Sequence, residues 1–74
     1  MTDEQRKLVA FTQIIKVMQQ DAEDIMNAVD TAAGDLGEGR RNGAVGALCA
    51  VDTSLERLAS LLSAVRALHR SLPL

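Results

Sequence analysis

The glycine-rich stretch from Gly34 to Val51 is the first candidate for chemistry in this 74-residue chain. It holds all five glycines and places Arg40 and Arg41 between them. Its glycine spacing departs by one residue from the dinucleotide-binding fingerprint, and no P-loop lysine follows. We therefore interpret the stretch as a chain reversal. Arg40 and Arg41 at its tip are candidate contacts with an acidic partner, because loop tips are exposed.

The other residues that could perform catalysis or bind metal are isolated from one another. His69 and Cys49 are the only residues of their types, and Cys49 has apolar neighbours. No cysteine, histidine or carboxylate group has the spacing of a metal site, and no serine, histidine and aspartate constellation is present. The sequence predicts no catalytic residue, metal, cofactor or small-molecule ligand, and we expect the protein not to be an enzyme.

Charge is distributed unevenly along the chain. The segment 21–38 contains six acids and no base, whereas the segment 57–70 contains three arginines, His69 and no acid. The net charge of −2 argues against general nucleic-acid binding, which depends on many contacts between basic side chains and phosphates. The sequence therefore has an acidic middle and a basic end.

A long helix is predicted in the first half of the chain. Thr2 and Gln5 have the spacing of a capping box, which places the helix start at Asp3. Gly34 stands where a glycine often ends a helix, so we predict a helix over 3–33. Its apolar residues recur at alternating spacings of three and four, typical of a coiled-coil seam: Leu8, Phe11, Ile15, Met18, Ala22, Ile25, Val29 and Ala32.

A second helix is predicted over 43–72, after a glycine-rich turn over 34–42. The same spacing returns in a second seam: Ala44, Leu48, Val51, Leu55, Leu58, Leu62, Val65, His69 and Leu72. Pro73 limits continuation of this helix. Thr53 and Glu56 form a second candidate capping box after Asp52, so a break in the helix near Asp52 is the alternative.

Two helices of similar length joined by a short turn predict an all-α, antiparallel helical hairpin as a single domain over 1–74. With the turn centred near Glu38, positions whose numbers sum to about 76 face each other. Phe11 then meets Val65, and Ala32 meets Ala44. Large residues would meet at the open end and small ones at the turn.

The two seams leave further apolar residues beside them, so each apolar stripe is wider than one partner helix covers. A two-fold dimer forming a four-helix bundle would cover this surface, and so would a helix of another protein. The residues we predict for association are Ile14, Val17, Met26, Leu61 and Leu68. Val9 and Val45 also lie beside the seams.

These features predict a non-enzymatic protein interaction module that acts through an apolar helical stripe. An adaptor, a chaperone, an inhibitor and a small regulator fit this description equally. The polar start MTDEQRK is unlike a signal peptide, and no apolar run is long enough to cross a membrane. We therefore expect a cytoplasmic protein without a membrane partner.

A small RNA-binding hairpin dimer is the alternative function. In an antiparallel hairpin, basic residues from both ends of the chain meet in what we call the basic pole: Arg6, Lys7, Arg66 and Arg70. Asp3 and Glu4 dilute this charge, and no aromatic residue is present there to stack on bases. The sequence therefore favours a protein partner.

Overall fold

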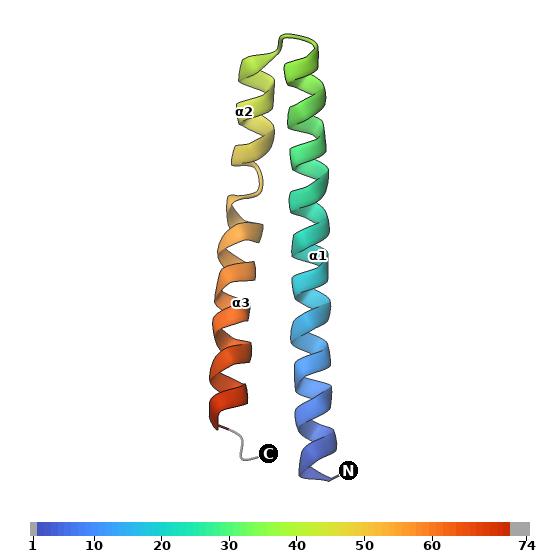
Figure 1. Ribbon diagram of the computed structural model, residues 1–74, viewed down its shortest axis with the longest axis vertical. Coiled ribbons are helices and arrows are strands. Elements are labelled where there is room, and N and C mark those ends of the chain that lie inside the picture. The colour runs from blue at the N-terminus through green and yellow to red at the C-terminus, as the bar shows by residue number, and fades with distance from the viewer. Residues whose placement is uncertain (1, 72–74) are drawn as a thin grey trace.

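The computed structural model describes residues 2–71 as a helical hairpin with two antiparallel arms (Figure 1). The first arm is α1, Asp3–Gly37. The second arm consists of α2, Arg41–Cys49, and α3, Asp52–Ser71. The predicted all-α hairpin is confirmed, and the second arm is bent at residues 50 and 51, close to the break that Asp52 suggested.

The start of α1 is closed by the predicted capping box. The Gln5 backbone N–H donates to Thr2 Oγ1 at 3.2 Å, and the Thr2 backbone N–H donates to Gln5 Oε1 at 2.8 Å. Two amides that the first turn leaves without helical partners are thereby satisfied. Asp3 and Glu4 follow in the first turn, where negative charge stabilises the helix dipole.

The end of α1 lies at Gly37, one turn beyond the predicted end at residue 33. The prediction that Gly34 ends the helix is wrong, because the chain leaves α1 through Gly39 instead. Gly39 has a φ of 77°, a left-handed conformation that disfavours any residue with a Cβ. Its N–H donates to the Leu36 carbonyl at 3.0 Å. The reversal therefore spans residues 38–40 rather than 34–42.

The bend in the second arm is a local kink bridged by backbone hydrogen bonds. The Val51 N–H donates to Leu48 O at 3.3 Å, and the Leu55 N–H donates to Val51 O at 2.9 Å. Helix α3 already begins at Asp52, so Thr53 lies inside its first turn. Within residues 2–71 no hydrogen bond joins Thr53 to Glu56, so the second capping box does not form.

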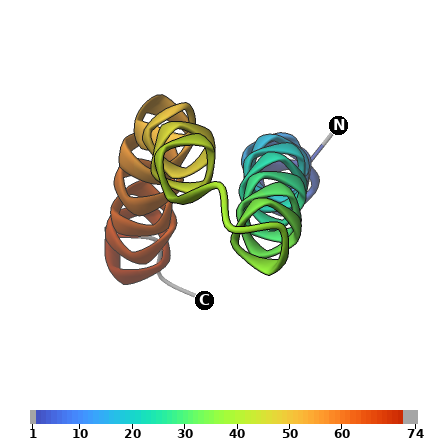
Figure 2. The same ribbon diagram turned by 90° about the horizontal axis from the view of Figure 1, so that it is seen from above.

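The hairpin is thin, because it consists of only two columns of helix placed side by side (Figure 2). Its extents are 55 × 18 × 14 Å, and its radius of gyration is 16.9 Å. A compact domain of this length would have a radius of gyration of about 11 Å. The buried apolar residues in the described part of the chain are Ala32, Ala44 and Val51, so no enclosed core forms.

The contact between the arms uses half of each predicted seam. Phe11, Met18, Ile25 and Ala32 of α1 and Ala44, Val51, Leu58 and Val65 of the second arm lie at least partly buried between the arms, as predicted. The other half of each seam is wrong. The exposed members are Leu8, Ile15, Ala22 and Val29 of α1 and Leu48, Leu55, Leu62 and His69 of the second arm. Leu72, the last predicted member of the second seam, lies outside the described residues.

In each arm, the residue immediately before each exposed seam member lies at the contact between the arms in its place. In α1 these are Lys7, Ile14, Asp21 and Ala28, and in the second arm they are Ala47, Ser54, Leu61 and Leu68. Each arm is therefore rotated about its own axis relative to the prediction, so that a neighbouring column of residues, meaning those that share one heptad position, faces the other arm. This rotation brings Asp21 against Arg57 and places small residues such as Ala28 and Ser54 where the arms meet. It also moves whole rows of leucine, isoleucine and valine to the surface.

Candidate protein interaction surface

The exposed large apolar side chains of the described residues are concentrated on one side of the hairpin, which we call the apolar face. In α1 it contains Leu8, Ile15, Val29 and Leu36, and in the second arm Leu48, Leu55 and Leu62, with Met26 and Val45 at its margins. These are nine of the eleven large apolar residues that stand exposed, the others being Val9 and Val17. Leu8, Met26 and Leu36 are each nearly 60 % exposed, at 59, 58 and 58 %.

Helical periodicity explains why these residues share a side of each arm. In α1 the exposed row falls on every seventh residue at 8, 15, 22, 29 and 36, and in the second arm at 48, 55 and 62. Residues seven apart lie above one another on an α-helix that follows a heptad repeat. Each arm thus has three apolar heptad positions, and the partner arm covers two of them.

A groove near the turn shows that the rows of the two arms flank the same surface. The groove has a volume of about 410 Å³. Val29 and Leu36 line it from α1, and Leu48 lines it from α2, while Ala32 and Ala44 lie between the arms. The remaining lining residues are Ala33, Arg41 and Val45. Arg41 is the sole charged side chain in this lining, so the groove is mainly apolar.

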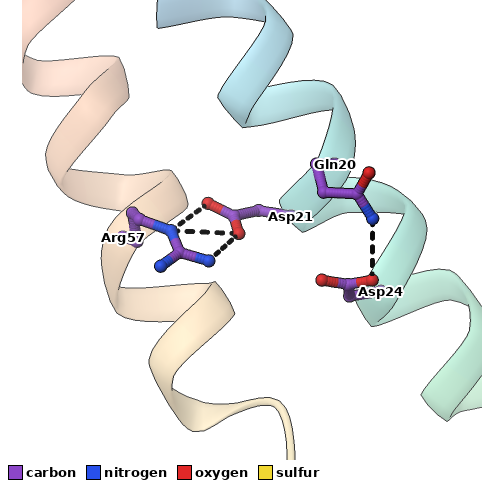
Figure 3. A network of polar contacts seen from close by, with 4 residues as sticks. All are labelled: Gln20, Asp21, Asp24 and Arg57. Carbon is purple, nitrogen blue, oxygen red and sulfur yellow. Dashed lines mark hydrogen bonds and ion pairs between the residues drawn. The ribbon is translucent and has the colours of Figure 1, made fainter.

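The opposite side of the contact, which we call the polar face, contains an ion pair between the arms (Figure 3). Arg57 Nε donates to both oxygens of Asp21, at 3.1 Å and 2.9 Å, and Arg57 Nη2 donates to Asp21 Oδ1. Asp21 is fully buried, while Arg57 is about half exposed. Beside them, Gln20 Nε2 donates to Asp24 Oδ1 at 3.1 Å.

The hydrogen bonds of this pair determine how its groups titrate. Donation by Arg57 holds the pKa of Asp21 below its ordinary value, outweighing the burial that acts in the opposite direction. Asp21 likewise raises the pKa of Arg57, and Asp24 adds to this through its charge. The buried carboxylate is therefore ionised and its oxygens accept hydrogen bonds, as expected for a structural contact between the arms.

The two arginines at the turn occupy different environments. Arg40 Nη2 lies 2.8 Å from Asp35 Oδ1, and its other terminal nitrogen pairs with Glu38. The hydrogen bond from Arg40 to Asp35 is the main cause of the raised pKa of Arg40. The charge of Arg40 is thus used within the turn, whereas Arg41 lines the apolar groove. Binding of an acidic partner by either arginine stays a prediction.

The residues predicted for association are divided among different surfaces. Ile14, Leu61 and Leu68 are half-buried between the arms, Met26 stands at the margin of the apolar face, and Val17 is exposed on the polar side. Sequence reasoning missed Leu8, Ile15, Leu48, Leu55 and Leu62 as surface residues, since it placed them inside the hairpin. These residues belong to rows that recur at every seventh position, and this spacing could have indicated a surface that continues along the molecule.

The basic pole belongs to the start of α1 and the end of α3, which both lie at the open end of the hairpin (Figure 1). Arg6 Nη1 lies 3.9 Å from Asp3 Oδ1, and Arg70 Nε donates to the Arg66 carbonyl at 3.2 Å. Lys7 is partly covered between the arms. RNA binding by these residues stays a prediction.

Neither a metal centre nor a membrane span is found in the part of the chain that the structure describes. Residues 2–71 contain no cluster of three histidine, cysteine or carboxylate side chains that could hold a metal ion. None of the three helices combines the length and apolar character needed to cross a bilayer. Cys49 and His69 are both exposed and lie on different helices. No protein-family model, curated protein or solved structure matches this chain.

Proposed function

We propose that this protein is a non-enzymatic interaction module whose apolar face packs against helices of a protein partner. The observation that carries this proposal is the gathering of nine of eleven exposed large apolar residues on one side of the hairpin. Isolated surface leucines are ordinary, but contiguous apolar patches mark interaction sites. A row of heptad-spaced residues along each arm is the surface that another helix covers.

The accessible surface of the chain supports an unfilled binding site. The hairpin exposes 5486 Å². A compact monomer of the same mass would expose about 4,400 Å². The excess of roughly 1,000 Å² is comparable with the area of about 800 Å² that one partner contributes to a standard protein interface.

The titratable groups support a role without catalysis. A general acid or base at neutral pH needs a pKa moved towards neutrality. The pKa of Asp21 moves away from neutrality, because its carboxylate accepts hydrogen bonds from Arg57. The proposed function therefore depends on shape and apolar area, and the shifted pKa values of Asp21 and Arg57 arise from the contact between the arms.

The proposal is tested with a pair of variants that differ only in the face they alter. Leu62→Glu places a charge on the apolar face, and Ser60→Glu places one at an exposed position of the same helix outside it. We expect wild type and Ser60→Glu to form an assembly, detected by sedimentation or by affinity capture with mass spectrometry, and Leu62→Glu to lose it. The proposal fails if the helical wild-type protein forms no assembly that Leu62→Glu disrupts.

A further inference from the structure

We infer that the occupant of the apolar face is a second copy of this chain, packed head to tail around a two-fold axis at the level of Ala22 and Leu55. This inference rests on the proposed function and names its partner. In this arrangement α1 lies antiparallel to α1 of the second copy, and the two second arms lie antiparallel to each other. The product is a four-helix bundle with a turn at each end.

The exposed row of α1 is symmetric about Ala22. Reversal about that residue pairs Leu8 with Leu36 of the second copy, and Ile15 with Val29. Ala22 then meets its own counterpart, where the absence of a large side chain lets the helices approach closely. A two-fold interface requires this self-complementarity, because each residue of the patch contacts a residue of the same patch.

The exposed row of the second arm is symmetric about Leu55. Reversal about that residue pairs Leu48 with Leu62 of the second copy and places Leu55 against its own counterpart. The next places in this row are Arg41 and His69, which pair with each other at the two ends of the interface. The leucines are thus enclosed between polar ends, as in interfaces with an apolar centre and a polar rim.

The two centres of symmetry lie at the same height along the hairpin. The ion pair places Asp21 beside Arg57, and Ala22 and Leu55 are one and two residues from these positions. In antiparallel helices, the levels of Ala22 and Leu55 then differ by about one residue, or roughly 1.5 Å. A single two-fold axis therefore passes through the centres of both rows, although the residue spacing of one row does not determine the centre of the other.

The opposite packing, with both turns at the same end, fits the residues less well. It would place α1 of one copy over the second arm of the other at equal height. Leu8 would then face His69, and Leu36 would face Arg41. Head-to-tail packing instead matches every large apolar residue of the rows with another large apolar residue.

Charge also favours head-to-tail packing. In the half nearer the turn, residues 22–55, acids outnumber bases six to two, whereas bases outnumber acids six to four in the remainder. Head-to-tail packing sets each acidic half against a half of opposite net charge. The alternative would set the two acidic halves together, and like-charge juxtaposition disfavours an interface.

Disulfide trapping tests the position of the axis. In a Cys49→Ala background, Ala22→Cys and Leu55→Cys are prepared singly, with Glu23→Cys as the matched control at the same height. A residue on a two-fold axis lies beside its own counterpart, within the short Cα separation that a disulfide needs. On oxidation, we expect each axis variant to form a disulfide-linked dimer and Glu23→Cys to form little.

The outcomes separate this inference from the proposed function. Sedimentation of the unmodified protein should show twice the 7.9 kDa chain mass. A mixed disulfide between Ala22→Cys and Leu55→Cys, without self-linked product from either, would overturn head-to-tail packing. A helical monomer that captures a different protein, with capture lost in Leu62→Glu, would overturn the second copy and leave the proposed function standing. A helical monomer with no such capture would overturn both.

Discussion

The two faces of the hairpin are completed in different ways. On the polar face, the buried Asp21 carboxylate accepts three hydrogen bonds from Arg57, so its polar atoms are satisfied within one chain. On the apolar face, the leucine rows of both arms stand exposed, and the buried apolar residues in the described part of the chain are Ala32, Ala44 and Val51. One face is closed by a contact between the arms, and the other is left open.

This difference assigns a separate role to each face. The ion pair has its carboxylate buried between the arms, so it forms only in the observed alignment, with Asp21 turned inward. Apolar rows have little directional preference but supply most of the free energy of association. The polar face therefore favours one register of the arms, and that register determines which residues lie on the apolar face.

The largest effect should follow from charge at the centre of the apolar face. Leu55→Glu would bring two carboxylates together at the two-fold axis, away from water, where neither has a partner. We expect the dimer dissociation constant to rise at least a hundredfold, roughly 2.7 kcal/mol or more. Sedimentation over a concentration series measures this change, and Ser60→Glu is the control. Dimerisation of Leu55→Glu with wild-type affinity would show that the apolar face is not the interface.

A loss of folded stability should follow from breaking the ion pair on the polar face. Arg57→Met leaves the buried Asp21 carboxylate without its donors, and an unpaired buried charge is strongly unfavourable. We expect the thermal midpoint, measured by circular dichroism, to fall clearly in Arg57→Met. The double variant Asp21→Leu and Arg57→Leu should recover much of the loss, since a buried pair replaced by apolar residues is often tolerated. An unchanged midpoint in Arg57→Met would show that the pair does not hold the arms in register.

Acid should weaken the polar face through the same carboxylate. The pKa of Asp21 is lower in the folded chain than its ordinary value of 3.8. Its contribution to the free energy of unfolding is therefore complete above the unfolded-state pKa and is lost as pH falls below about 4. Urea titrations at several pH values between 7 and 3 should show a steeper acid loss for wild type than for the double variant. Parallel pH profiles would contradict this assignment.

The architecture could be predicted from sequence because it depends on local patterns. The Thr2 and Gln5 capping box, the helical periodicity and the bend near Asp52 all act between residues close together in the chain. The turn was less predictable, since Gly34 and Gly39 both match a helix end, and only the backbone of the reversal decides which adopts a positive φ.

The interaction surface could be predicted only in part, for a reason that lies in the heptads. With three apolar positions in each repeat, two different pairs of columns can form the contact between the arms, and periodicity does not rank them. In the structure, the pair of columns that forms the contact brings together Asp21 and Arg57, which are 36 residues apart in sequence. Ranking columns by hydrophobicity put Leu55 inside and Asp21 outside, the reverse of what the structure shows.

The smallest effect should come from the valine exposed on the polar side. Val17 is 43 % exposed and Ile15 is 47 % exposed, so their exposures alone do not distinguish them. Only Ile15 belongs to the heptad row that would meet a second copy. We expect Val17→Gln to change the free energy of unfolding and of dimerisation by no more than about 0.5 kcal/mol, as at an ordinary surface site. Ile15→Gln should weaken the dimer at least tenfold, or about 1.4 kcal/mol, because each dimer buries two copies of the residue. Sedimentation and urea unfolding of both variants measure the contrast. Equal losses would extend the interface around α1 to the polar side and support Val17 as an association residue.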